Sequence, residues 1–385
     1  MSAPSPPPKT LKYRAISPGD PAPYFRQRST SNENYVFDTA AGRYLVLCLF
    51  GSAGDASGRK MLSLLNTHRA LFDDERFAFF GVSHDRRDES LGRVRESLPG
   101  VRFFWDADGT IGRLFGSLPV GEPSGPEQRV RPLWVVLDPN MRVRDVVSGA
   151  AALDVAHIGS MLSALPPVDL ASGYATAAPV LHLPRVFDAG LCARLIAYFE
   201  RMGGEDSGFM TEKDGLTTLK VDYGHKRRSD RIVEDPELIS EIQARVHRRI
   251  APEILKVHYF NATRMERYLI GCYEAETGGH FRPHRDNTTK GTAHRRFAVS
   301  INLNSEFDGG ELRFPEYGSQ TYKPLPGSAI VFSCSLLHMV TPVTRGRRFA
   351  FLPFLYDDAA ARIREQNNAY LGEGTTPYKL EQTRG

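Results

Sequence analysis

The chain has 385 residues, which is more than one hydrophobic core usually contains, so two domains are expected. Its 41% hydrophobic and 24% charged residues are typical of a soluble globular protein, and a net charge of +4 does not by itself indicate nucleic-acid or membrane binding. The longest apolar run, 44–50, has strand length and cannot span a bilayer. The scattered cysteines and the lack of an apolar signal segment in MSAPSPPPKT make a reducing, cytoplasmic location the expectation.

The first half of the chain alternates between strand-like and helix-like periodicity. Residues 1–16 are rich in proline and are expected to be disordered. The expected strands cover 44–50, 77–83, 101–106 and the two arms of a hairpin at 133–147, and the expected helices cover 59–72, 90–98 and 154–165. This order predicts an α/β domain over 17–166, with helices on both faces of its sheet.

The second half begins after a linker-like stretch at 167–178, which is rich in small residues and proline. Helical patterns come first, and many short strands separated by Gly, Pro and Asp turns follow. The expected helices cover 189–202 and 236–255, and the expected strands cover 267–275, 295–304, 310–317, 328–335 and 348–356. The pattern predicts a sandwich or barrel over 179–360, followed by a loosely ordered polar tail at 361–385.

Two motifs in the first domain resemble the peroxiredoxin branch of the thioredoxin-like superfamily: GDPAPYF at 19–25 and FGSAGDASGRK at 50–60. The resemblance implies a thioredoxin-like fold. In that family a cysteine begins the helix, whose N-terminus stabilises a thiolate, but Arg59 stands at that position here. Cys48 lies inside an expected buried strand and does not replace that thiol. A scaffold, dimerisation or docking role is therefore expected instead of peroxidase activity.

The second domain contains the segment GGHFRPHRDN at 278–287, in which His284 and Asp286 form an HxD motif. With eleven histidines in the chain, this motif is weak without support. Support comes from His338, which follows an apolar strand, and from Arg348 ten residues later. Two histidines and one carboxylate form the facial triad of non-haem Fe(II), and arginine offers a bidentate fork for a carboxylate.

These residues resemble the Fe(II)/2-oxoglutarate-dependent oxygenases of the prolyl 4-hydroxylase-like branch, over roughly 262–357. The resemblance implies an α+β double-stranded β-helix (jelly-roll) domain that uses Fe(II) and 2-oxoglutarate, and it is compatible with ascorbate as a further reductant. The residues matched are His284, Asp286 and His338 as iron ligands, Arg348 for the C5 carboxylate of 2-oxoglutarate, and Tyr273 and Asn302 in the co-substrate pocket.

The activity implied is hydroxylation of an unactivated C–H bond, with O₂ and 2-oxoglutarate as co-substrates and succinate and CO₂ as products. Halogenases of this superfamily lack the carboxylate ligand, so Asp286 favours hydroxylation. The substrate stays open between a small molecule, an amino acid and a protein prolyl residue, and a homodimer is compatible with the pattern. The alternatives are a non-catalytic scaffold or sensor module, which uses the thioredoxin-like half to bind a partner, and a thiol peroxidase, which Arg59 disfavours.

Four further features have competing interpretations. His280 lies four residues before His284, but the glycines and proline around them disfavour the helix that an HxxxH zinc site needs. His280 is expected to be structural or to contact substrate. Arg295 precedes an expected strand, where it would face substrate at the mouth of the site. His294 and the run HKRRSD at 225–230 are interpreted as solvated, although the run would also suit an acidic substrate.

Overall fold

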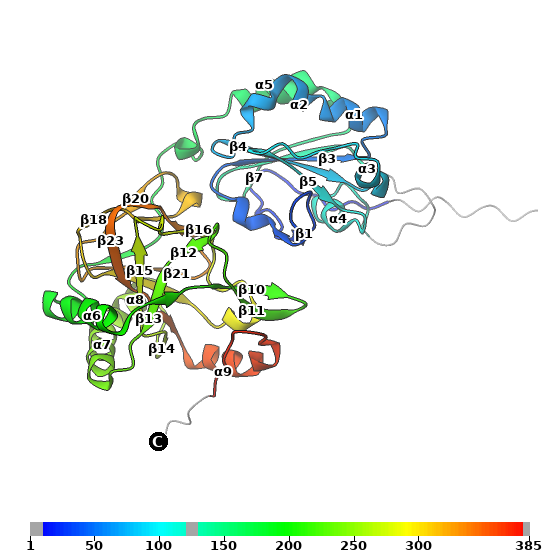
Figure 1. Ribbon diagram of the computed structural model, residues 1–385. Helices are drawn as coiled ribbons and strands as arrows, with labels where there is room; N and C mark the ends of the chain where they lie inside the picture. Colours follow the sequence, from blue (N-terminus) through cyan, green and yellow to red (C-terminus); the bar gives the residue numbers. More distant parts are fainter. Residues whose placement is uncertain (1–10, 121–129, 380–385) are drawn as a thin grey trace, which may run out of the picture. The chain divides into compact units, whose positions relative to one another are not determined.

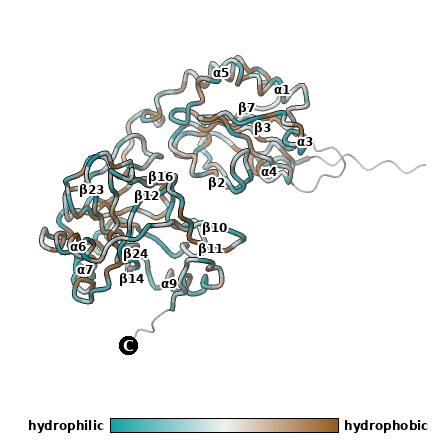
Figure 2. The backbone as a smooth tube through the Cα atoms, in the orientation of Figure 1, coloured by the Kyte–Doolittle hydropathy of each residue, from teal (hydrophilic) through white to brown (hydrophobic). Residues whose placement is uncertain are grey.

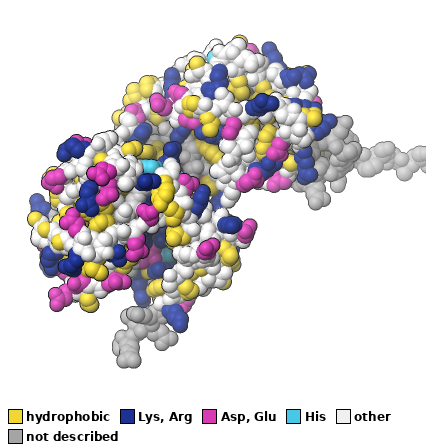
Figure 3. All heavy atoms as spheres, viewed as in Figure 1, with side chains coloured by type: hydrophobic (Ala, Val, Ile, Leu, Met, Phe, Trp, Pro, Cys, Tyr) yellow, Lys and Arg dark blue, Asp and Glu magenta, His cyan; other side chains and the backbone are white. Residues whose placement is uncertain are grey.

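The structure is a computed structural model that describes residues 11–120 and 130–379 (Figure 1). It divides into two compact units: an N-terminal unit of the described residues up to Ala177 with Pro315–Gly318, and a C-terminal unit of Ala178–Phe314 and the residues from Ser319. Basic and acidic side chains are interspersed over the face shown in Figure 3. Within the described ranges, no helix is both apolar enough and long enough to cross a membrane.

A five-stranded sheet forms the centre of the N-terminal unit, in the order β5-β4-β3-β6-β7. Its strands are β3 (Tyr44–Gly51), β4 (Phe77–Ser83), β5 (Val101–Trp105), β6 (Leu133–Leu137) and β7 (Val143–Ser148). Strands β3, β4 and β5 are parallel, and β6 and β7 are antiparallel to their neighbours. Every residue of β3 is buried, as expected of a central strand that is apolar along its length (Figure 2).

Helices cover both faces of this sheet, as the sequence pattern predicted (Figure 1). The helices are α1 (Ala56–Leu62), α2 (Leu64–His68), α3 (Arg86–Ser90), α4 (Thr110–Phe115) and α5 (Val155–Ser163), with 3₁₀ helices η1 (Phe37–Ala40), η2 (Arg69–Leu71), η3 (Gly149–Leu153) and η4 (Val168–Leu170) and a short ladder of β1 (Arg26–Gln27) and β2 (Tyr35–Val36). Helices α1, α2 and α5 share one face, and α4 lies on the other.

The helix predicted at 90–98 lies earlier in the chain, and this prediction was wrong. Helix α3 begins after Asp85, whose side chain accepts a hydrogen bond from the backbone N–H of Arg87 and so caps the helix. It ends where Gly92 adopts a φ of 59°. Capping by Asp85 therefore determined the helix position, and the apolar spacing beyond it did not.

The first turn of α1 packs closely against the loop that precedes it. A Cβ on Gly58 would lie 1.9 Å from the carbonyl oxygen of Ser52, so only glycine fits there. Arg59 follows on the exposed side of α1. Cys48 is fully buried, and this burial raises the pKa of its thiol well above the ordinary value. Neither position provides an accessible thiolate.

Both described ends of the chain are more ordered than their composition predicted. Near the N-terminus, the backbone N–H of Val120 donates to the carbonyl of Lys12 at 2.7 Å. Near the C-terminus, the expected loose tail begins inside helix α9 (Asp358–Gln366), which is followed by η7 (Asn367–Tyr370). Asp357 caps α9, and the buried Ala360 packs it against the unit. The remainder of these two predictions, at 1–10 and 380–385, lies outside the described residues.

Two sheets form most of the C-terminal unit. The larger sheet follows the order β14-β24-β17-β23-β15-β13-β9, with three attached strands. Its strands are β8 (Leu181–Leu183), β9 (Glu205–Asp206), β13 (Ser229–Ile232), β14 (Arg264–Glu266), β15 (Leu269–Glu274), β17 (Phe297–Asn302), β18 (Phe307–Gly309), β21 (Ala329–Ser333), β23 (Val343–Phe351) and β24 (Phe354–Tyr356).

The smaller sheet follows the order β12-β16-β22-β19-β20. Its strands are β12 (Lys226–Arg227), β16 (His280–His284), β19 (Leu312–Arg313), β20 (Thr321–Tyr322) and β22 (His338–Val340). A separate hairpin is formed by β10 (Phe209–Lys213) and β11 (Leu216–Lys220), and the 3₁₀ helices here are η5 (Lys290–Thr292) and η6 (Pro315–Tyr317).

Three helices support the larger sheet: α6 (Ala189–Met202), α7 (Pro236–Arg249) and α8 (Ala251–His258). Their apolar residues, such as Leu195 and Ile242, share one core with Ile270 and Phe351 of the sheet. This packing holds one face of β15 and β23 rigid. The opposite face of the same strands carries the polar residues described next.

Candidate metal centre and co-substrate pocket

The smaller sheet brings two histidines opposite each other. His284 ends β16 and pairs with His338 at the start of β22. Asp286 follows β16, and its backbone N–H donates to the carbonyl of Cys334 at 3.0 Å. Nε2 of His284 lies 3.7 Å from one carboxylate oxygen of Asp286, and Nε2 of His338 lies 3.4 Å from the other. One ligand atom from each residue lies within 4.8 Å of the other two, which is close enough for one metal ion.

Backbone carbonyls hold both imidazole rings in the orientation that a metal site requires. Nδ1 of His284 donates to the carbonyl of Arg282 at 2.8 Å, and Nδ1 of His338 donates to that of Leu336 at 3.0 Å. This leaves Nε2 of each ring as the metal-binding nitrogen. Burial, and then the neighbouring His338, hold the pKa of His284 well below its ordinary value, which favours the neutral, metal-binding ring. The residues present therefore fit an Fe(II) facial triad.

Aromatic side chains enclose the two rings. Phe281 stacks on His284 with 3.5 Å between ring centroids and an interplanar angle of 19°. Phe332 meets the ring of His338 edge-on at 4.7 Å. These contacts limit rotation of both imidazoles and exclude water from one side of each.

Arg348 lies on β23 and is 2% exposed. Its Nε and Nη2 donate to Oδ1 of Asn302 at 3.1 and 3.0 Å, and Nη2 also donates to Oγ of Ser300 at 2.9 Å. Its Nη1 is buried and has no hydrogen-bond partner in the described part of the chain. A buried donor without an acceptor is costly, and a carboxylate would satisfy it. The unpartnered N–H of Arg348 therefore suits an acidic co-substrate group.

Tyr273 lies directly opposite Arg348, on β15. It is 1% exposed, and its ring centroid lies 5.4 Å from the guanidinium carbon of Arg348. Asn302, from β17, is hydrogen-bonded to the same guanidinium. The three residues matched to the co-substrate pocket thus lie together, although their contact with 2-oxoglutarate stays a prediction.

A continuous series of contacts links the metal-site histidines to this pocket. The ring of Phe281 lies 5.0 Å from Nζ of Lys226, which donates to Oγ of Ser207 at 2.5 Å. Nη2 of Arg228 donates to the same oxygen at 3.4 Å, and its Nη1 donates to the phenol oxygen of Tyr273 at 3.2 Å. The two halves of the candidate site therefore belong to one connected cluster of side chains.

The run at 225–230 is not the solvated loop that was expected. It forms β12 and the start of β13, and Lys226 and Arg228 are only 3% and 9% exposed. The carboxylate of Asp230 accepts two hydrogen bonds from Arg228, at 2.5 and 2.7 Å. These three charged residues alternate along the chain, so on a strand they share one buried face. That alternation was the available signal, and the density of charge in the run obscured it.

The expectation that His294 is solvated was also wrong. His294 is 1% exposed, and its Nε2 lies 3.1 Å from a carboxylate oxygen of Glu266. Arg295 donates to the other oxygen of Glu266 at 2.7 Å and, through Nη1, to the backbone carbonyl of Asp286 at 3.4 Å. Arg364 forms a further ion pair with Glu266 at 2.7 Å. Glu266 was missed because its three partners are distant in sequence.

His280 does not belong to a helical HxxxH motif, because it begins the strand β16, as the surrounding glycines and proline predicted. Its Nδ1 donates to the carbonyl of Gly278 at 2.7 Å, and its Nε2 lies 3.5 Å from the carbonyl of Gly224. These contacts give His280 a structural role in the strand and turn. Contact of His280 or Arg295 with substrate stays a prediction.

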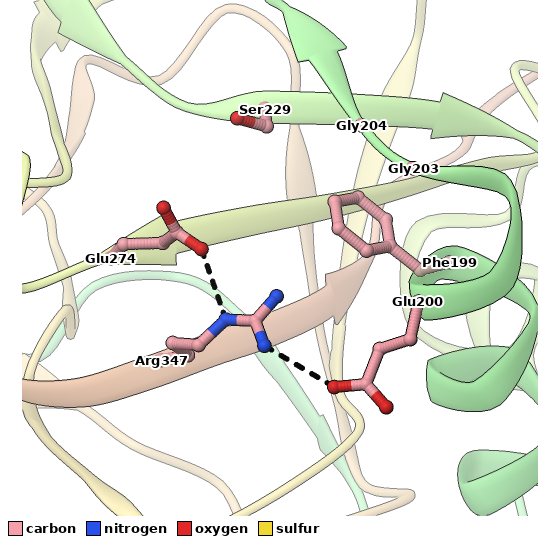
Figure 4. Close-up of a pocket in the computed structure, with 7 residues that line it drawn as sticks. All are labelled: Phe199, Glu200, Gly203, Gly204, Ser229, Glu274 and Arg347. Carbon is pink, nitrogen blue, oxygen red and sulfur yellow. Dashed lines mark hydrogen bonds and ion pairs between the residues drawn. The ribbon is translucent and has the colours of Figure 1, made fainter.

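A separate open pocket of about 410 Å³ lies in the C-terminal unit beside α6 (Figure 4). Its lining residues are Phe199, Glu200, Gly203, Gly204, Ser229, Glu274 and Arg347. Three of these residues lie on strands: Ser229, Glu274 and Arg347. Each is next in sequence to a residue of the candidate site or its cluster, so its side chain points to the other face of the sheet. Arg347 forms ion pairs with Glu274 at 3.0 Å and with Glu200 at 3.2 Å. None of the predicted site residues lines it.

Comparisons with known proteins bear on both parts of the chain. Among solved structures, it is similar to a Pseudomonas putida prolyl-4-hydroxylase (18% identity, TM-score 0.36, covering 49% of this chain and 95% of the other). It is also similar to Peroxidoxin BcpB from Mycobacterium tuberculosis (20% identity, TM-score 0.34, covering 40% and 99%). A PKHD-type hydroxylase from Pseudomonas putida (strain F1) is 29% identical over 191 residues, covering 44% of this chain and 75% of that protein.

The family comparison agrees with the geometry of the candidate site. Residues 268–356 match the 2OG-Fe(II) oxygenase superfamily. The matched range contains the triad residues His284, Asp286 and His338 as well as Arg348. The C-terminal part of this chain is a 2OG-Fe(II) oxygenase domain, for which Fe(II) is the cofactor and 2-oxoglutarate and O₂ are the co-substrates.

Proposed function

We propose that this chain is an Fe(II)- and 2-oxoglutarate-dependent dioxygenase that hydroxylates an unactivated C–H bond and releases succinate and CO₂. The observation that carries the proposal is a complete three-ligand set in the same domain as a buried arginine with an unpaired N–H. We further propose that the two sheets of this domain form a double-stranded β-helix. A non-catalytic scaffold or sensor is not favoured, because it would not need these four groups together.

In this proposal each side chain has a separate task. His284 and His338 bind the iron through Nε2, and Asp286 binds it through its carboxylate. The bound iron supplies the oxidising chemistry by activating O₂. Arg348 binds the distal C5 carboxylate of 2-oxoglutarate with its free Nη1, so the diacid is oriented with its keto-acid end away from the arginine. The aromatic rings around the histidines exclude water from the reacting centre.

The substrate class is proposed by similarity. Curated relatives of this chain are named PKHD-type hydroxylases, which supports a hydroxylase. We propose a prolyl residue of a protein, an amino acid or a small molecule as its substrate. Arg295 is proposed to face the substrate, because Glu266 and the backbone of Asp286 hold its guanidinium beside the triad. His280 is proposed as a second residue near the substrate. A homodimer and a role for ascorbate stay predictions.

Replacing Asp286 with alanine tests the proposal directly. We expect Asp286→Ala to lower succinate formation from 2-oxoglutarate by more than roughly a hundredfold, because one of three protein ligands is lost. The measurement is NMR or mass spectrometry of succinate with Fe(II), O₂ and a panel of prolyl peptides, together with the gain of one oxygen in the peptide. Asp308→Ala, at an exposed aspartate on β18, is the matched control. Unchanged succinate formation in Asp286→Ala would refute the ligand assignment.

A further inference from the structure

Neighbouring strands of the larger sheet carry a row of polar side chains on one face. Arg228 immediately precedes β13, Tyr273 lies on β15 and Arg348 lies on β23. Ser229 pairs with Cys272, and Tyr273 pairs with Arg348, so the three side chains of the row are successive neighbours across the sheet. All three are buried, and the ring of Tyr273 lies 5.6 Å from one guanidinium carbon and 5.4 Å from the other.

Asp230 holds Arg228 in place. Its two carboxylate oxygens accept from Nε and Nη2 of Arg228 at 2.5 and 2.7 Å, which fixes the plane of the guanidinium. The remaining nitrogen, Nη1, donates to the phenol oxygen of Tyr273 at 3.2 Å. A guanidinium has no acceptor, so in this contact the phenol oxygen accepts. The phenol proton must therefore be directed at a different group.

Two buried donors are thus left on residues that pair across neighbouring strands. One is the O–H of Tyr273, whose hydrogen-bond partner among the described residues, Arg228, can only donate. The other is Nη1–H of Arg348, which has no partner among those residues. A carboxylate has two oxygens and can accept from both, whereas a neutral carbonyl offers only one oxygen.

We infer that Arg228, clamped by Asp230, is a positioning residue that turns the phenol O–H of Tyr273 toward the distal carboxylate of 2-oxoglutarate, beside Nη1 of Arg348. The inference rests on the proposed function and adds to it a determinant of co-substrate affinity outside the matched family range. Arg228 acts through Tyr273 and does not touch the iron ligands.

The test is a double-mutant cycle of Arg228→Gln and Tyr273→Phe. Anaerobic enzyme loaded with Fe(II) is titrated with 2-oxoglutarate, and binding is followed by the visible charge-transfer band. We expect each single variant to raise the Kd about tenfold, the typical effect of one hydrogen bond to a charged group. The double variant should bind no more weakly than Tyr273→Phe, because Arg228 acts through that phenol. In steady-state assays of Arg228→Gln, the KM for 2-oxoglutarate should rise while kcat at saturation stays within about threefold.

The affinity of the Fe(II)-loaded enzyme for pyruvate, measured by competition with 2-oxoglutarate, distinguishes a specific positioning effect from general damage to the fold. Pyruvate lacks the distal carboxylate, so its affinity should not change in Arg228→Gln or Tyr273→Phe. The control variant is Arg345→Gln, which removes an exposed arginine from the same strand as Arg348. If Arg228→Gln does not fold, Asp230→Asn and Arg228→Lys provide the same test, because each loosens the clamp while keeping a polar group. Each should weaken 2-oxoglutarate binding and leave pyruvate binding unchanged.

Three outcomes would overturn the inference: unchanged 2-oxoglutarate affinity in the folded variants, a double variant whose loss equals the product of the single losses, or an equal loss of pyruvate affinity. These outcomes differ from failure of the proposed function. In that case the wild-type enzyme itself would neither bind 2-oxoglutarate in the presence of Fe(II) nor form succinate.

Discussion

The buried carboxylate of Glu266 has three basic partners near the site. Its carboxylate contacts His294, Arg295 and Arg364, and Arg295 also reaches the backbone of Asp286. Burial alone would raise the pKa of Glu266, but the three partners together hold it well below its ordinary value. One carboxylate therefore joins strand β14, helix α9 and the loop that follows the predicted metal ligand Asp286.

We predict that Glu266→Gln lowers the free energy of unfolding by about 3 kcal/mol, because it leaves two partly buried arginines, Arg295 and Arg364, without their counter-ion. The contribution of Glu266 to the stability of the wild-type protein also depends on pH. Since the folded pKa is lowered, the stabilisation is fully present above the unfolded value of about 4.3 and is lost as the pH falls through and below that value. Melting temperatures recorded between neutral pH and pH 3 should fall more steeply for wild type than for Glu266→Gln. Glu306→Gln, at an exposed glutamate, should parallel the wild type.

The sequence predicted those residues of the candidate site that belong to recognisable motifs. The HxD spacing and the later histidine and arginine indicated His284, Asp286, His338 and Arg348, and the structure brings the first three within reach of one metal ion. Arg228 could not be predicted in the same way, because its role depends on its neighbour across the sheet and not on its neighbours in sequence. Strand pairing of this kind is not visible in a single sequence.

At the scale of elements, the loop after Asp286 is held between two segments that are distant in sequence. The backbone N–H of Gly291 donates to Oγ1 of Thr217 on β11 at 2.9 Å. On the other side, the side-chain amide of Asn367 donates to the carbonyl of Lys290 at 2.7 Å, and Nζ of Lys290 lies 3.5 Å from the ring centroid of Tyr370. The β10–β11 hairpin and the C-terminal helices therefore support the loop that begins at a predicted iron ligand.

We predict that Thr217→Val destabilises the protein by about 1–3 kcal/mol, because the N–H of Gly291 loses its buried acceptor while the shape of the side chain is preserved. Urea unfolding measures this change. Thr218→Val, on the neighbouring and more exposed position of β11, is the control and should be close to neutral. Equal effects of the two substitutions would show that the hydroxyl of Thr217 does not support the loop.

Periodicity predicted the buried strands more accurately than the helices. Continuous apolar sequence correctly indicated β3 and β4, because only a strand buried on both faces tolerates it. The helix expected at 59–72 is instead divided into α1, α2 and η2. Helix ends depend on capping contacts, such as that of Asp85, which the spacing of apolar residues does not encode.

At the scale of the whole molecule, an α/β unit, whose one cysteine in the described residues, Cys48, is buried, accompanies an oxygenase domain. The two compact units divide at residue 177, within the expected linker at 167–178, and the proposed domain limits 17–166 and 179–360 stay a prediction. Composition could not indicate that Pro315–Gly318 groups with the N-terminal unit, because such an assignment depends on tertiary contacts.

We predict that the full chain does not reduce hydrogen peroxide with a thiol reductant, because burial keeps Cys48 protonated and Arg59 occupies the expected cysteine position. The measurement is reductant-dependent peroxide consumption by the wild type and by Cys48→Ser. Both proteins should match the rate without enzyme and should form succinate at equal rates. Peroxide turnover that disappears in Cys48→Ser would contradict this prediction.

The carbonyls that orient His284 and His338 belong to the main chain. No single amino-acid replacement can delete a peptide oxygen, so the tautomer of each imidazole is inherited together with the local strand geometry. Substitution of nearby side chains therefore leaves these two acceptors of the imidazole N–H groups in place. The main chain thus determines how the two predicted iron ligands are oriented, whichever side chains surround them.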